Sequence, residues 1–211
     1  MLDPSPRLPE LPESRRSRKK SKTRADLMAA GARLFEENGY DETTTSDIAE
    51  LADVSQRTLF RHFDTKEALL YGDMEELQIE LRASLASRPA DEPILTLLRA
   101  VMLSLADNFE RHRQRRLLQA RLAATYPAVS SYSRAVVQTN WERELIVAIS
   151  ERLDVDPLVD PRPEIIAGAT MSAIRIATRQ WTAGGGKADY LGLIVDALDA
   201  IGRLSELEHP V

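Results

Sequence analysis

The sequence contains no cysteine, and its three histidines are scattered at positions 62, 112 and 209. Without cysteine the chain cannot form disulfides, thiolate nucleophiles or cysteine-ligated metal sites, and the histidine spacing matches no metal motif. No run of eighteen apolar residues is present, and the N-terminus lacks the apolar stretch of a signal peptide. We therefore expect no metal, no cofactor and no membrane segment, and a cytoplasmic protein.

The residue sets from which enzymes build active sites are also missing. We find no plausible set of serine, histidine and aspartate, and the three glycines at 184–186 do not follow a predicted strand, as a phosphate-binding loop would. The sequence therefore favours a binding protein over an enzyme. Turnover of a bound small molecule is the observation that would revive the enzyme hypothesis.

Positive charge is scarce outside the N-terminus. Residues 1–24 hold eight basic residues against three acidic ones, whereas the remaining residues hold 20 against 30. Four prolines and little apolar content predict no core for residues 1–14, and seven cations lie between Arg15 and Arg24. We interpret residues 1–21 as a disordered, Pro-rich and basic arm. Two roles stay open for it: it enters a DNA minor groove, or it only aids solubility.

Residues 43–66 have the pattern of two short helices joined by a tight turn. Thr44 is placed to cap the first helix, and Asp47, three residues later, can reach back to the backbone of the cap. Asp53 follows at the turn, where aspartate tolerates the left-handed conformation, and Ser55 can cap the second helix. This arrangement predicts a helix-turn-helix.

The second of these helices has an outer face without carboxylates. Leu59 and Phe63, at i and i+4, are expected to enter the core. The residues left for the outer face are Gln56, Arg57, Thr58, Phe60, Arg61 and His62. Because residues 25–70 contain ten acidic residues and only four basic ones, an acid-free face within them is suited to a DNA major groove. The alternative is an ordinary solvated helix face.

This segment resembles the TetR family of transcriptional regulators. The matching residues are Gly39-Tyr40, Thr43-Thr44, Ile48-Ala49, Val54-Ser55, Thr58-Leu59-Phe60, His62-Phe63 and Lys66-Glu67-Ala68-Leu69. The sequence departs from the family pattern at Asp53 and Arg57, where glycine is usual, and at Phe60, where tyrosine is usual. The resemblance implies binding to double-stranded DNA through the second helix. The predicted DNA-binding residues are those of its outer face together with Ser55 and Arg24, and with Thr44 and Lys66 as contacts to the DNA backbone.

Helical periodicity continues through the rest of the chain and predicts an all-α fold. The other expected helices span residues 23–38, 66–87, 93–112, 115–125, 127–153, 163–183 and 188–207. We assign residues 22–69 to a helix-turn-helix DNA-binding domain and residues 70–211 to a helical C-terminal domain. The resemblance implies about nine helices, with a C-terminal domain that binds a small molecule and forms a homodimer through its last two helices. A role for these two helices in the core of one subunit stays open.

Large side chains of the C-terminal helices are candidates for a ligand pocket. The candidates are Met102, Leu105, Phe109, Leu122, Tyr126, Trp141, Met171 and Arg175. The alternative for the apolar ones is a place in the ordinary core. Arg175 and Arg179, at i and i+4, can hold an anionic group or form internal salt bridges. Most arginines of residues 113–121 are expected to face water. We expect an apolar or amphipathic ligand.

These observations predict a sequence-specific transcriptional regulator. In its simplest form it is a repressor that binds a palindromic operator as a homodimer and is released by a small molecule. The alternative is an architectural DNA-binding protein without a ligand switch, which would show weak sequence preference. Selection of bound sequences from random DNA separates the two.

Overall fold

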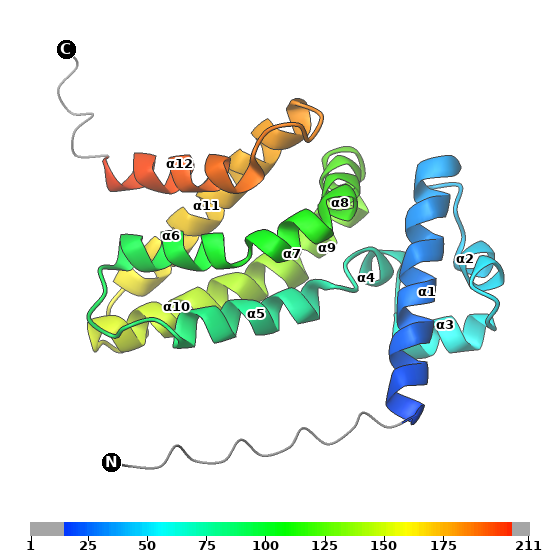
Figure 1. The fold of residues 1–211 in the computed structure, drawn as a ribbon, viewed down its shortest axis with the longest axis horizontal. Helices are drawn as coiled ribbons and strands as arrows, with labels where there is room; N and C mark the ends of the chain where they lie inside the picture. Colours follow the sequence, from blue (N-terminus) through cyan, green and yellow to red (C-terminus); the bar gives the residue numbers. More distant parts are fainter. Residues whose placement is uncertain (1–14, 204–211) are drawn as a thin grey trace, which may run out of the picture. The chain divides into compact units, whose positions relative to one another are not determined.

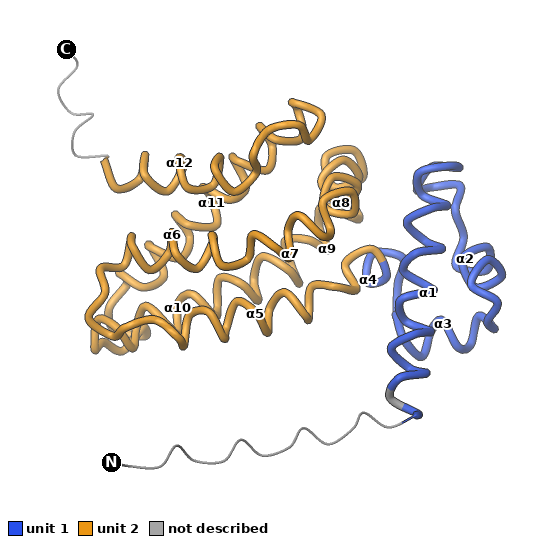
Figure 2. Tube along the Cα trace, viewed as in Figure 1, with its two compact units in different colours: residues 1–69 blue, residues 70–211 orange. Residues whose placement is uncertain are grey.

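A computed structural model describes residues 15–203, and all regular structure in that range is helical, which confirms the predicted all-α class. No helix within this range is long and apolar enough to span a membrane. The chain divides into two compact units, residues 1–69 (unit 1) and residues 70–211 (unit 2) (Figure 2).

Unit 1 is built from three helices and the start of a fourth (Figure 1): α1 (Arg15–Glu37), α2 (Thr45–Leu51), α3 (Gln56–His62) and α4 (Lys66–Leu70). Leu27, Ile48 and Leu59 are buried between α1, α2 and α3. Gly31 permits close packing, since a Cβ there would lie 2.3 Å from the Leu69 side chain. Asp53 has a φ of 52°, the left-handed conformation predicted for the turn. The helix-turn-helix pattern therefore folds as its local signals indicate.

Helix α1 begins earlier than the sequence analysis predicts. We expected a helix from Thr23 and a disordered arm up to residue 21, but residues 15–21 are helical, so that prediction is wrong for them. Residues 1–14 of the predicted arm lie outside the described part of the chain. Arginine and lysine have high helix propensity, and no proline or glycine interrupts residues 15–30. A Lys22–Asp26 ion pair at 2.7 Å adds an i,i+4 contact.

Unit 2 contains the remaining helices. Those with bounds close to the prediction are α8 (Arg113–Thr125), α9 (Pro127–Tyr132), η1 (Ser133–Gln138), α10 (Thr139–Leu153), α11 (Arg162–Ala183) and α12 (Tyr190–Gly202). Segments α9, η1 and α10 follow one another without a break over the predicted helix 127–153, but the middle segment is π-helical. A π-helical segment is uncommon and often lies at a functional site.

Two predicted helices are each divided in two. The helix expected over 66–87 is interrupted at residues 71–73, which separate α4 from α5 (Met74–Ala86). Gly72 has low helix propensity, and the Asp73 carboxylate is drawn into a buried ion pair with Arg116. The helix expected over 93–112 is divided at Leu105 into α6 (Ile94–Ser104) and α7 (Ala106–Arg111). No proline or glycine signals that second break.

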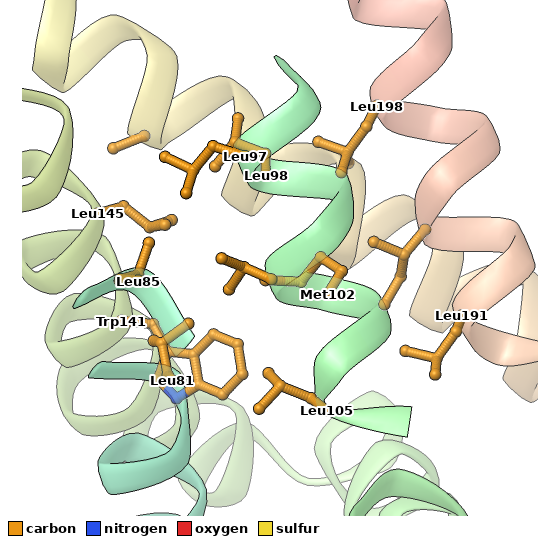
Figure 3. Close-up of a cluster of buried hydrophobic side chains, with 14 of the residues drawn as sticks. Leu81, Leu85, Leu97, Leu98, Met102, Leu105, Trp141, Leu145, Leu191 and Leu198 are labelled. Carbon is orange, nitrogen blue, oxygen red and sulfur yellow. The ribbon is translucent and has the colours of Figure 1, made fainter. Parts of the chain in front are cut away.

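The core of unit 2 lies between α5, α6, α10, α11 and α12. Figure 3 shows Leu81 and Leu85 of α5 facing Leu145 of α10, with Met102 of α6 and Leu198 of α12 nearby. Helices α11 and α12 lie side by side (Figure 1). Their apolar residues therefore serve in part as the core of one subunit, the alternative that the sequence left open.

Candidate DNA-binding surface and ligand cavity

The caps predicted for α2 and α3 are formed. The Thr44 hydroxyl accepts from the Asp47 amide at 3.2 Å, and the Asp47 carboxylate accepts from the Thr44 amide at 2.9 Å, which makes a complete capping box. The Thr44 hydroxyl also donates to the Asp47 carboxylate at 2.7 Å, and this hydrogen bond, together with the one from the Thr44 amide, lowers the pKa of Asp47. The Ser55 hydroxyl accepts from the Thr58 amide at 3.1 Å. Thr44 and Ser55, both predicted DNA contacts, therefore use their hydroxyls to hold the two helices.

The outer face of α3 is exposed, as the spacing of its buried residues requires. Gln56, Arg57, Phe60 and Arg61 are exposed, and Thr58 is half-buried. The Gln56 side-chain amide donates to the Thr45 hydroxyl at 3.1 Å, which ties α3 to the start of α2. This face carries two guanidinium groups and no carboxylate. Its composition fits hydrogen bonding to base edges and phosphates.

The end of α3 is packed against α1 by Arg24. The Arg24 guanidinium donates to the His62 carbonyl at 3.1 Å and lies 4.3 Å from the centre of the Phe63 ring. His62 is half-buried, and its Nδ1 atom is buried without a hydrogen-bond partner. Burial, together with the positive charges of Arg61, Arg24 and Lys20, lowers the pKa of His62. Arg24 thus has an internal role that the sequence analysis did not anticipate.

Lys66 also binds inside unit 1. Its ammonium group donates to the carbonyls of Tyr40 at 2.8 Å and Thr43 at 3.0 Å, and it lies 4.3 Å from the centre of the Tyr40 ring. The Tyr40 hydroxyl donates to the Glu67 carboxylate, which helps to lower the pKa of Glu67 against the opposing effect of burial. These contacts join the first turn of α4 to the segment before α2. The predicted phosphate contact of Lys66 would require it to leave or share them.

Unit 2 contains a cavity of about 560 Å³ that is partly open to solvent. Five of the eight predicted pocket residues line it: Met102, Phe109, Trp141, Met171 and Arg175. The other three, Leu105, Leu122 and Tyr126, lie outside its lining. Leu105 and Leu122 are buried in packing contacts instead, and Tyr126 is half-buried at the end of α8. Helical phase, which the sequence analysis did not resolve for these residues, decides which side chains reach the cavity.

The π-helical segment and α11 supply cavity residues that the sequence analysis missed. They include Ser133, Arg134, Val137 and Gln138 from η1, and Ile174, Thr178, Arg179, Trp181 and Thr182 from α11. On α11 these residues recur at helical spacing with Met171 and Arg175, so one face of that helix forms a wall. The recurrence could have been found by extending the spacing from Met171. Nothing in the sequence signals the π-helical segment.

Arg116 is the largest departure from the expected site. We expected most arginines of residues 113–121 to face water, yet Arg116 is only 7% exposed and lines the cavity. Its guanidinium lies 3.0 Å from the Asp73 carboxylate and donates to Asn108 and Gln119 side-chain oxygens at 3.3 and 3.2 Å. The Asp73 contact is an ion pair without hydrogen-bond alignment. Burial lowers the pKa of Arg116, and the Asp73 charge opposes that effect.

A polar network therefore connects the cavity wall to the beginning of unit 2. Gln119 of α8 donates to the Leu70 carbonyl at 2.9 Å and to the Asp73 carboxylate at 3.3 Å. Tyr71 and Met74, from the same short segment, line the cavity themselves. Residues 70–74 follow directly on the last residue of unit 1, Leu69, in the chain. The network thus ends at the segment that leads to the DNA-binding helices.

The last two helices divide their apolar residues between the inside and the surface. Ala173 is 1% exposed, and Ala177 and Ile194 are fully buried. Ile165 and Ile176 of α11 remain on the surface, with 64% and 36% of their area exposed. Any dimer contact of α11 would use these exposed residues rather than Ala173.

Comparisons with known proteins agree with both units. Residues 27–71 match the model of "Bacterial regulatory proteins, tetR family", and residues 92–204 match the "MftR C-terminal domain". The chain is 31% identical over 173 residues to the HTH-type transcriptional regulator TcmR of Streptomyces glaucescens, which covers 79% of this chain and 76% of TcmR. It is 26% identical over 169 residues to the putative mycofactocin biosynthesis transcriptional regulator MftR of Mycobacterium tuberculosis, covering 80% and 84%.

A solved structure shares the fold. The transcriptional regulator FadR of Bacillus subtilis, in complex with stearoyl-CoA, superposes with a TM-score of 0.63 at 14% identity, over 84% of this chain and 96% of FadR. The matched models and relatives are regulators and give no support to the enzyme alternative. A C-terminal model that covers more than half of the chain, and a relative above 30% identity, show that the chain belongs to the TetR family of bacterial transcriptional regulators.

Proposed function

We propose that this protein is a repressor that binds operator DNA through α3 and leaves it when a small molecule enters the cavity of unit 2. The exposed, acid-free face of α3 supports the first part, because its arginine, glutamine and aromatic side chains suit base edges and phosphates. The cavity supports the second part, since its volume is in the range of small-molecule sites. Because bacterial DNA lies in the cytoplasm, the proposal keeps the expected location.

The observation that carries the proposed switch is the network around Arg116. It binds α8, a wall of the cavity, to Leu70 and Asp73 at the start of unit 2. A ligand acts on DNA affinity only if it binds the two conformations with different affinity. Contacts that differ between those conformations must then reach unit 1 through the chain segment that begins at residue 70. Coupling of about 1–3 kcal/mol would lower operator affinity roughly 5- to 150-fold.

We further propose a homodimer formed by the exposed faces of α11 and α12. Ile165 and Ile176 give α11 an exposed apolar edge that a second subunit would cover. Two copies of α3, about 34–36 Å apart, would then read one palindrome. Ile176→Arg is the probe of this interface, because a charge there meets the partner rather than the subunit's own core. Sedimentation that still finds a dimer would move the interface elsewhere.

The basic turns of α1 have two possible roles in this scheme. Arg18, Lys19 and Lys20 are exposed and extend the helix beyond the core of unit 1. They either neutralise DNA phosphates or serve only solubility. Replacing all three by glutamine separates the roles, since phosphate contacts would flatten the dependence of log K on log salt by about 0.9 for each.

Selection of bound duplexes from random DNA, followed by titration with the recovered sequence, tests the repressor proposal. We expect a palindrome with two half-sites one helical turn apart, and release of that DNA by a cavity ligand. Weak sequence preference and no response to any cavity ligand would favour the architectural alternative. A specific palindrome that no cavity ligand releases would keep the DNA-binding role and remove the switch.

A further inference from the structure

We propose that the cavity ligand is an amphipathic anion, with its acidic group held by Arg134, Arg175 and Arg179 and its apolar body inside the cavity. These three residues are called the arginine rim here, because each lines the cavity and is exposed to solvent. The inference rests on the proposed function, since it names the chemical class of ligand for the same cavity.

The charge of the cavity lining is the first support. Among residues 15–203, four arginines line the cavity, and no aspartate, glutamate, lysine or histidine does. This one-sided lining occurs in a chain with 33 acidic and 28 basic residues. A site that gathers cations and excludes acids favours a negatively charged ligand and disfavours a cation of the same shape.

The second support is that the rim arginines are not neutralised within the described part of the chain. Ion pairs form elsewhere in unit 2, for example Arg82–Glu144 at 2.7 Å and Arg116–Asp73 at 3.0 Å. No ion pair is found for any rim arginine within residues 15–203. The internal salt bridges that the sequence left possible for Arg175 and Arg179 are therefore not formed among these residues. Their guanidinium groups remain available for carboxylate or phosphate oxygens.

The rim arginines, rather than Arg116, are placed to bind the acidic group of the ligand. Arg175 and Arg179 are i and i+4 on α11, with Thr178 between them in the same wall, and Arg134 comes from η1. An anion bound at this exposed edge keeps part of its hydration, so its desolvation cost is small. Arg116, by contrast, is buried and already paired with Asp73. A ligand anion there would be fully desolvated and would displace a carboxylate.

The interior of the cavity fits the apolar part of such a molecule. Leu77, Met102, Phe109 and Ile194 line it. The Trp141 side chain, 6% exposed, also lines it, and its indole Nε1–H is buried without an acceptor. A buried donor without a partner loses the hydrogen bond that water would give it, which is unfavourable. A ligand with an acceptor oxygen near its apolar body would accept a hydrogen bond from this indole N–H. The cavity therefore favours a ligand that carries such an acceptor.

Four probes with one ten-carbon chain test the charge: decanoate, decyl phosphate, decanol and decyltrimethylammonium. Intrinsic fluorescence reports binding, because both tryptophans of the chain, Trp141 and Trp181, line the cavity. We expect both anions to bind at least about tenfold more tightly than decanol, because only the anions form charge-assisted hydrogen bonds with the rim arginines. The cation should bind least. The stronger of the two anions identifies the acidic group as carboxylate or phosphate.

Variants of the full-length protein locate the acidic group. Arg175→Gln with Arg179→Gln, and separately Arg134→Gln, should weaken the anions about tenfold or more and leave decanol unchanged. Arg143→Gln is the matched control, because Arg143 is exposed on α10 and does not line the cavity. Helical circular dichroism checks that each variant folds. Arg175→Lys should retain part of the affinity for the anions, because lysine keeps the positive charge but lacks the two parallel N–H donors of the guanidinium group.

The outcomes separate this inference from the proposed function. Equal affinity for decanol and decanoate, or an unchanged affinity of the rim variants for both anions, would overturn the anionic class and leave the ligand cavity standing. Binding of none of the four probes would count against the cavity as a ligand site and therefore against both. Anion binding that Arg116→Gln abolishes and the rim variants do not would move the charge to the interior and refute the rim.

Discussion

The two units place their basic side chains in contrasting environments. In unit 1, Arg24 and Lys66 donate to backbone carbonyls, while Arg57 of α3 is exposed and carries no ion pair within residues 15–203. In unit 2, Arg116 is buried against Asp73, while the arginine rim stays unpaired among the described residues. Each unit thus contains cations that hold the fold and cations that are available to a partner. The comparison shows that hydrogen-bond partners, rather than residue type, separate the two roles.

The largest expected effect comes from breaking the internal pair of unit 2. Arg116→Met leaves the buried Asp73 carboxylate with only the longer contact to Arg115, at 3.9 Å, which should destabilise the protein by up to about 3–5 kcal/mol. Urea unfolding followed by tryptophan fluorescence measures this, because both tryptophans lie in unit 2. Arg143→Met, on the exposed face of α10, should change stability by less than about 0.5 kcal/mol. Equal effects of the two variants on stability would show that Arg116 does not stabilise the fold.

A smaller loss is expected from the internal lysine of unit 1. Lys66→Met removes two charge-assisted hydrogen bonds and should lower the free energy of unfolding by roughly 1.5–3 kcal/mol. The salt dependence of operator binding should stay unchanged. Urea unfolding followed by circular dichroism, compared with tryptophan fluorescence, assigns the loss to unit 1. If the variant lowers the slope of log K for DNA against log salt by about 1, Lys66 contacts a DNA phosphate, as the sequence predicts.

Substitutions on the exposed face of α3 should change DNA binding more than stability, although Gln56→Ala also removes the hydrogen bond to Thr45. Gln56→Ala or Arg57→Ala is expected to cost about 1–3 kcal/mol of operator affinity and to relax preference at one base pair. Fluorescence anisotropy with the selected operator and single-base variants of it measures both quantities. Arg33→Ala is a control, since Arg33 is exposed on α1 and paired with Glu37. Unchanged affinity and preference in Arg57→Ala would place the recognition face elsewhere.

The smallest expected effect is a pH dependence from His62. Its folded pKa lies below the ordinary value of 6.5, so the unfolded chain takes up a proton more readily than the folded unit. The contribution of His62 to stability should therefore be complete above pH 6.5, the ordinary pKa, and should be lost as the pH falls from there through the lower folded pKa. Urea unfolding of unit 1 by circular dichroism at about pH 7.5 and 5.5 should show a smaller difference in His62→Gln. An identical difference in both proteins would exclude His62 as the cause.

Local signals explain why the DNA-binding helices could be predicted. The caps of Thr44 and Ser55 and the left-handed Asp53 depend on residues within a few positions of each other. The network of Arg116 could not be read in this way, since Asp73 is 43 positions away and only tertiary packing brings the two together. The same reason applies to Leu105, where no local signal marks the break between α6 and α7. Long-range packing overrides helix propensity there.

The cavity falls between these cases. Met102, Phe109 and Trp141 could be chosen as large side chains on helices, but size alone also selected Leu105 and Leu122, which face the packed interior. Rotational phase on each helix makes the difference, and it depends on how the helices meet. Arg116 lines the cavity despite its charge because Asp73 supplies a counter-charge that the sequence does not place nearby.

The π-helical segment makes the helix from Pro127 to Leu153 sensitive to insertions and deletions. Residues 133–138 contribute Arg134 and Gln138 to the cavity through a register that a regular α-helix would not give. A π-helical turn contains about one residue more than an α-helical turn. Loss of one residue from this segment could therefore restore α-helical geometry while α9 keeps nearly the same rotation relative to α10. The change would fall on cavity residues within the segment, such as Arg134, while α10 kept its place in the core. A length change of one residue could in this way alter which ligands the cavity accepts without a change to any residue that remains.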